Sequence, residues 1–77
     1  MAEQMTIQVN GQPHRADPGI TIGTLLQELD IRPDRVAVEV NSQILERQEF
    51  GTRGLRNGDR VEIISFIGGG TEESTKL

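Results

Sequence analysis

The sequence predicts a small α+β domain in which one main helix packs across one face of a mixed sheet of four to five strands. Its 77 residues are enough for one domain only. Apolar and polar residues alternate in several short segments, as in half-buried strands, whereas a single segment has the spacing of an amphipathic helix. One helix laid on a sheet buries all of these apolar residues together.

The first two strands are predicted to form a hairpin. Apolar residues alternate with polar ones over residues 5–9, and Asn10 and Gly11 follow directly. This dipeptide favours a type I′ turn, because both central residues of that turn need a positive φ. The return strand at 12–16 contains Pro13, which has no backbone N–H to donate and therefore indicates an edge strand.

One helix is predicted after the turn at residues 17–19. Thr21 is a suitable N-cap, and Pro33 disfavours helical geometry at Arg32, so the helix should end near Asp30. Its apolar residues follow the i, i+3, i+4, i+7 spacing of a buried stripe. They are Ile22, Leu25, Leu26 and Leu29.

The second half of the chain predicts two further strands with irregular structure between them. Three valines alternate with other residues over 36–40, so they should point inward. Residues 44–50 predict a short, irregular strand or turn, and Leu55 should anchor the loop at 51–58. A turn at 57–59, with no expected chemistry, then leads into the last strand.

The last strand is predicted over residues 60–67. Val61 and Ile63 are the expected core pair, which leaves Ile64 and Phe66 on the opposite face. A helix or a loop could cover that face; otherwise Ile64 and Phe66, with Ile67, form a partner-docking patch. The order of elements is that of a β-grasp fold, in which the first and last strands lie side by side at the centre of the sheet.

Composition excludes several classes of function. The chain has no cysteine and a single histidine, so thiolate and histidine-cluster metal sites are excluded. We expect His14 to be solvated. The net charge of −4 argues against nucleic-acid binding and favours a partner with a basic docking surface. No segment indicates export or a membrane span, and a cytoplasmic location is the default expectation.

Three consecutive glycines, Gly68 to Gly70, follow the last predicted strand. They do not fit a phosphate-binding loop, because no Lys-Ser/Thr pair and no helix start follow them. Two interpretations remain. The glycines are either a flexible linker before a tail, or a thin arm that can enter a narrow channel in another protein.

Four segments together resemble the ThiS family of sulfur carrier proteins over residues 5–70. They are MTIQVNGQ, GITIGTLLQEL, VAVEVN and NGDRVEIISFIGGG. The resemblance implies a ubiquitin-like β-grasp protein that is not an enzyme. Its C-terminal glycine is adenylated by a ThiF-type partner, which uses ATP and Mg²⁺, and becomes a thiocarboxylate with sulfur that starts on cysteine. Thiazole synthase, ThiG, then uses this sulfur for the thiazole ring of thiamin.

Carried onto this chain, the resemblance makes Gly70 the sulfur-accepting residue, with Gly69 as the alternative. Gly68 and Gly69 form the threading arm, and the chain itself binds no cofactor. Thr71 follows Gly70 here, so residues 1–70 are expected to form the domain and residues 71–77 a disordered extension that a peptidase removes or that blocks the reaction.

Three other functions are compatible with the same residues. A MoaD-like carrier for molybdopterin shares the fold and the chemistry. A noncovalent β-grasp interaction module would use the glycines as a linker only. Conjugation to protein lysines, as in ubiquitin, would share the activation step.

Overall fold

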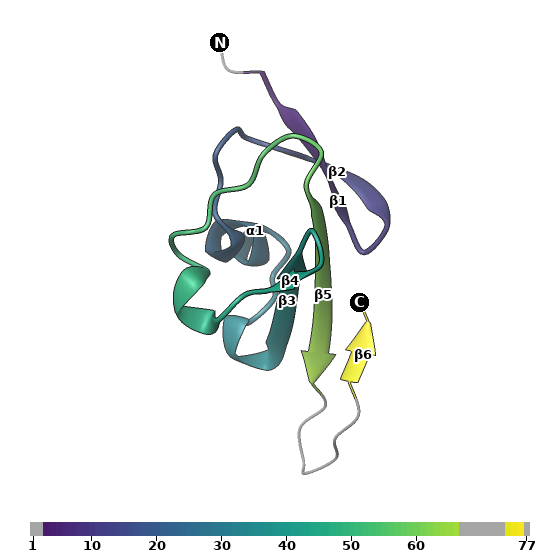
Figure 1. The fold of residues 1–77 in the computed structure, drawn as a ribbon, viewed down its shortest axis with the longest axis vertical. Coiled ribbons are helices and arrows are strands. Elements are labelled where there is room, and N and C mark those ends of the chain that lie inside the picture. Colours follow the sequence, from purple (N-terminus) through teal and green to yellow (C-terminus); the bar gives the residue numbers. More distant parts are fainter. Residues whose placement is uncertain (1–2, 67–73, 77) are drawn as a thin grey trace.

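The protein is described by a computed structural model, which covers residues 3–66 and 74–76 (Figure 1). A mixed sheet has the strand order β2-β1-β5-β3-β4, and β6 pairs with β5 off this path. Helix α1 lies on one face of the sheet. The elements in chain order are β1 Met5–Val9, β2 Gln12–Ala16, α1 Ile22–Glu28, the 3₁₀ turn Pro33–Arg35, β3 Val36–Val40, β4 Gln43–Ile44, the 3₁₀ turn Arg47–Glu49, β5 Arg60–Phe66 and β6 Ser74–Lys76.

The predicted hairpin and edge strand are confirmed. β1 and β2 pair antiparallel, and the turn between them has φ of 51° at Asn10 and 81° at Gly11. Positive φ at both residues is what a type I′ turn requires. β2 is the edge strand on this side of the sheet. Because no strand of the described residues lies beyond it, the sheet loses no interior hydrogen bond where Pro13 has no N–H.

Helix α1 begins as predicted and ends two residues early. The Thr21 hydroxyl oxygen accepts a hydrogen bond from the Thr24 N–H at 3.2 Å, which is the expected N-cap. The helix ends at Glu28, because Asp30 has a φ of 62° and the Ile31 N–H turns back to the Leu26 carbonyl at 2.8 Å. The chain thus leaves the helix before the Pro33 constraint applies.

The core lies between α1 and the sheet, and it contains the residues that alternation predicted. β3 is buried at every second residue, and in β5 Val61 and Ile63 are 1% and 0% exposed. Leu55 anchors the long loop, as predicted, and the buried Phe50 closes the irregular segment. The remaining core residues are Met5, Ile7, Ala16, Ile22, Leu25, Leu26, Val36, Val38, Val40 and Leu45.

β5 is the central strand of the fold. It pairs antiparallel with β3 over five residue pairs and parallel with β1 at Gln8↔Arg60 and Val9↔Val61. The first strand and the predicted last strand therefore lie side by side, with β2 and β4 at the two ends of the order (Figure 1). The predicted α+β, β-grasp arrangement is confirmed.

β6 differs from the disordered extension predicted over 71–77. Its backbone pairs antiparallel with the end of β5, at Ile64↔Lys76, Ser65↔Thr75 and Phe66↔Ser74. This position is available because β1 pairs with only the first part of β5. The domain boundary predicted at residue 70 falls outside the described residues and stays a prediction.

Truncating a core residue should destabilise the protein far more than truncating an exposed residue of the same type. Ile63→Ala should lower the free energy of unfolding by about 2–5 kcal/mol, since it leaves a cavity at the centre of the sheet. Ile44→Ala is the matched control, because Ile44 is 72% exposed, and it should change stability by less than about 0.5 kcal/mol. Urea unfolding measures both. Equal losses would contradict the assigned core.

Candidate functional site

The candidate site begins at the C-terminal end of β5. Val61 and Ile63 point to α1, so alternation puts Ile64 and Phe66 on the other face of the sheet. Ile64 is half-buried and pairs across the sheet with Ala37, whereas Phe66 is 51% exposed. Both residues are therefore on the face opposite the core pair, and their role in partner docking stays a prediction. Ile67 and Gly68 to Gly70, the rest of the predicted site, lie outside the described residues.

The same outer face carries charged and apolar positions farther from the arm. Glu39 and Glu62 are directly opposed on β3 and β5, and Ile44 of β4 is the next residue across from Glu39. Among the described residues, Ile44 and Phe66 are the large apolar side chains most open to solvent. Phe66 is the one nearer to the glycines in sequence, which makes it the better candidate for docking close to them.

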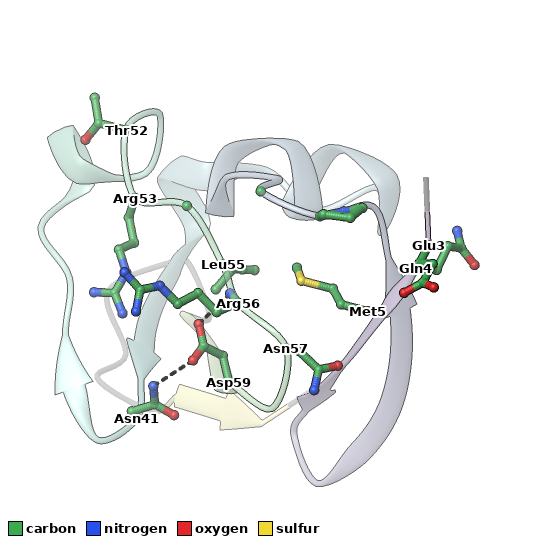
Figure 2. A pocket seen from close by; sticks show the side chains of 13 residues that line it. Glu3, Gln4, Met5, Asn41, Thr52, Arg53, Leu55, Arg56, Asn57 and Asp59 are labelled. Carbon is green, nitrogen blue, oxygen red and sulfur yellow. Dashed lines mark hydrogen bonds between the residues drawn. The ribbon is translucent and has the colours of Figure 1, made fainter. Parts of the chain in front are cut away.

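A pocket lies elsewhere, at the opposite end of β5 (Figure 2). It is an open groove of about 1170 Å³ between the chain leading into β1 and the loop before β5. Size alone would make it the default ligand site. Its lining residues are Glu3, Gln4, Met5, Pro18, Gly19, Asn41, Thr52, Arg53, Gly54, Leu55, Arg56, Asn57 and Asp59.

Three polar side chains in this groove, those of Asn41, Asn57 and Asp59, form hydrogen bonds that hold the fold together. The Asp59 carboxylate is 9% exposed and accepts hydrogen bonds from the Arg56 N–H at 2.9 Å and from Asn41 Nδ2 at 3.0 Å, the second of which is drawn in Figure 2. Asn41 Oδ1 accepts from the Arg60 N–H at 2.9 Å. Asn57 Oδ1 accepts from the Thr6 N–H at 2.9 Å and so ties the loop to β1.

Sequence reasoning gave the turn at 57–59 no chemistry, and it missed its structural role. Asp59 joins the loop before β5 to the turn after β3, where Asn41 has a φ of 51°. A buried carboxylate needs such partners. Asn57, Gly58 and Asp59 in sequence signalled a turn, but nothing in sequence indicated that Asn41 would be the partner.

The groove is therefore a structural joint, remote from the end of β5 that precedes the glycines in sequence. β5 is seven residues long and separates Asp59 from the arm. At about 3.3 Å per residue this is roughly 20 Å. This groove and the candidate site are consequently at opposite ends of one strand.

A smaller pocket corrects the prediction for His14. His14 lies opposite Ile7 on the helix-side face of β2 and is half-buried, not fully solvated. It lines a pocket of about 340 Å³ beside the hairpin and the end of α1. The other lining residues are Val9, Asn10, Gln12, Pro13, Leu29, Ile31 and Ile63.

The described part of the chain offers no metal centre. No group of three or more His, Asp or Glu side chains within residues 3–66 and 74–76 is arranged to hold a metal ion. Within the same residues, every buried side-chain nitrogen and oxygen has a hydrogen-bond partner. A search of these residues for a helix with the length and apolar character needed to span a membrane found none.

The fold and the exposed end of β5 define a β-grasp protein whose central strand leads into a glycine-rich segment. More particularly, the chain belongs to the ThiS family, because the model described as ThiS family matches residues 7–70. The family predicted from the four sequence segments is confirmed.

Individual relatives agree with this assignment. The sulfur carrier protein ThiS of Escherichia coli is 32% identical over 66 residues, which cover 86% of this chain and 100% of that protein. A crystal structure of a thiamine biosynthesis protein (ThiS) from Geobacter metallireducens has a TM-score of 0.74 and 36% identity, and covers 86% of this chain and 100% of that chain.

A longer relative has a different name. A thiazole synthase from Magnetococcus marinus is 42% identical over 66 residues, which are 86% of this chain. The match covers only 20% of that protein, so this chain spans about a fifth of its length.

The Asp59 joint should contribute measurably to stability. Asp59→Ala leaves the Arg56 N–H and the Asn41 amide without their acceptor, so the free energy of unfolding should fall by about 2–3 kcal/mol. Asp34→Ala is the matched control: Asp34 is paired to Arg32 at 3.6 Å on an exposed surface, and its loss should cost less than about 0.5 kcal/mol. Thermal unfolding distinguishes the two. A stable Asp59→Ala protein would contradict the joint.

Proposed function

We propose that this chain is a sulfur carrier for thiazole formation in thiamin biosynthesis, whose Gly70 carboxylate is adenylated and converted to a thiocarboxylate. The observation that carries the proposal is the family match, which ends at residue 70, the last of three glycines directly after the central strand. The chain is a substrate of its partners and not itself a catalyst.

The chemistry accounts for the choice of residue. A carboxylate is a poor electrophile, and it becomes reactive when it attacks the α-phosphorus of ATP and displaces pyrophosphate. The acyl-adenylate then loses AMP to a sulfur nucleophile. The activating enzyme, with ATP and Mg²⁺, must hold the terminal carboxylate in a confined pocket, and glycines enter such a pocket because they have no Cβ to crowd it.

Gly70 must carry a free carboxylate for this reaction. In this sequence Thr71 follows Gly70, so the proposal requires cleavage of the peptide bond between them. A peptidase is the partner that this step implies. The described core lies entirely within residues 5–63, so removal of residues 71–77 takes no residue from it.

Thiazole synthase is the proposed acceptor of the sulfur. A segment similar to this chain occurs within a protein named thiazole synthase, which supports a functional connection between the two. The sequence relatives named sulfur carrier protein ThiS support the thiamin pathway over a MoaD-like role in molybdopterin synthesis.

Intact mass spectrometry tests the proposal. Protein ending at Gly70 should gain the mass difference between sulfur and oxygen when it is incubated with a ThiF-type enzyme, ATP, Mg²⁺ and a sulfur source. The full chain, with Thr71 in place, is the control and should show no gain. The proposal would be refuted if the mass of the truncated protein stays unchanged while the same enzyme modifies the carrier protein of its own organism.

A noncovalent interaction module predicts a different result. Protein isolated from its own source would then extend through Leu77, and deleting Gly68 to Gly70 would leave partner binding unchanged.

The apolar patch at the end of β5 should contribute to docking. Phe66→Ala should weaken binding to the activating enzyme by about tenfold or more, because an exposed aromatic side chain next to the arm is a typical binding hot spot. Ile44→Ala is the matched control, since it removes an exposed apolar side chain from β4. Calorimetric titration without ATP measures both. The docking role fails if the two variants lose affinity equally.

A further inference from the structure

On the edge of β5 that faces β1, the backbone groups at the beginning of the strand are hydrogen-bonded to β1. The Gln8 N–H donates to the Asp59 carbonyl at 2.9 Å, and the Asn10 N–H donates to the Val61 carbonyl at 2.8 Å. The hairpin turn then takes the chain into β2, so β1 supplies no further backbone group to β5. The rest of this edge needs another partner.

The side chain of Asn10 extends the closure by one residue. Its Oδ1 accepts from the Ile63 N–H at 2.7 Å, and its Nδ2 donates to the Ile63 carbonyl at 3.2 Å. The amide thus makes the pair of bonds that the next residue of a neighbouring strand would make. The amide of Asn10 pairs with the backbone groups of Ile63 and reaches no residue of β5 beyond it.

Ser65 is the next residue that faces this edge. Carbonyl groups of Asp59, Val61 and Ile63 all point to the β1 side, whereas the Arg60 carbonyl points to the β3 side and accepts from Asn41. Backbone groups of a strand alternate in direction, so the N–H and C=O of Ser65 point to the same edge as those of Ile63. Here β6 pairs in antiparallel register, with Thr75 opposite Ser65.

Apolar side chains flank this backbone position. Ile64 and Phe66 lie on the outer face on either side of Ser65, and the pocket of about 340 Å³ lies on the helix side, beside Asn10 and Ile63. Strand addition of this kind takes affinity from main-chain hydrogen bonds and specificity from side-chain contacts on the two faces.

We propose that the β5 edge at Ser65 is a strand-binding site for an extended segment of the activating partner, and that residues 74–76 occupy it in cis as a competitor. The proposal rests on the proposed function, because it names how the partner engages the strand that leads into the arm. The seated β6 shows which geometry the edge accepts: an extended segment running antiparallel to β5.

The cis segment is suited to being displaced. It pairs with only three residues, and such short pairing is marginal on its own in water. A partner segment that pairs at Ser65 and continues beside the arm would hold the arm extended for adenylation. Since one edge position accepts one strand, the tail and the partner exclude each other.

Two proline variants of the full chain test the cis pairing. Thr75→Pro removes the N–H that faces Ser65, so the Ser65 amide should exchange with solvent about fivefold faster, the effect of losing one hydrogen bond. Ser74→Pro is the matched control, because alternation turns the Ser74 N–H away from β5, and it should change exchange by less than about twofold. Equal exchange in both variants, or an unprotected Ser65 in the unmodified chain, would overturn the cis pairing.

Partner binding tests the competition. Without ATP, the Thr75→Pro chain should bind the ThiF-type enzyme more tightly than the unmodified chain, by up to about fivefold, because occupancy of the edge lowers the binding-competent fraction. Ser74→Pro should bind like the unmodified chain. On enzyme binding, Ser65 should become protected again in the Thr75→Pro chain. A Ser65 amide that stays exposed in that complex overturns the strand site.

Other outcomes are also decisive. If the Thr75→Pro chain dimerises and Ser65 is protected by a second copy alone, the assignment to a partner segment is wrong. These measurements need no ATP and no sulfur. The proposal of a strand-binding site and the proposal of sulfur transfer can therefore be supported or refuted independently of each other.

Discussion

The parallel pairing of β1 with β5 is the contact on which the rest of the structure depends. It joins the two ends of the described domain, yet only two residue pairs form it. Side chains compensate for this shortness at both ends: Asn57 accepts from the Thr6 N–H before the pairing begins, and Asn10 closes on Ile63 after it stops. The side chains of these two asparagines thus extend a β1–β5 pairing that is short in its backbone hydrogen bonds.

This arrangement gives the two ends of β5 different tasks. Around Asp59 every buried polar group has a partner, and the groove there is built from bonds that fix loops to strands. Around Phe66 an aromatic ring is exposed and the strand edge is left to a short segment. The groove at Asp59 is therefore a poor guide to the function of the protein, because the proposed chemistry needs a chain end presented to another protein.

Much of this fold could be predicted from sequence because local signals agreed with the final structure. Asn10-Gly11, the Thr21 cap and the alternating valines of β3 each depend on near neighbours only. The burial of His14 was misjudged, and the structural role of Asp59 was missed, for the opposite reason. His14 is half-buried because α1 ends beside the hairpin, and Asp59 is buried because it meets Asn41. Both depend on contacts between segments far apart in the chain, which a one-dimensional pattern does not contain.

The short β1–β2 hairpin has a consequence for attempts to make the protein more robust. A hairpin two residues longer would carry the regular ladder past Ile63 to Ser65, and the sheet would gain backbone bonds where Asn10 now supplies a substitute. Such a variant should resist heat better, yet the edge of β5 at Ser65 would be sealed into its own sheet and closed to the proposed partner strand. Selection for a working carrier would then favour the short hairpin, whereas selection for stability would favour a longer one.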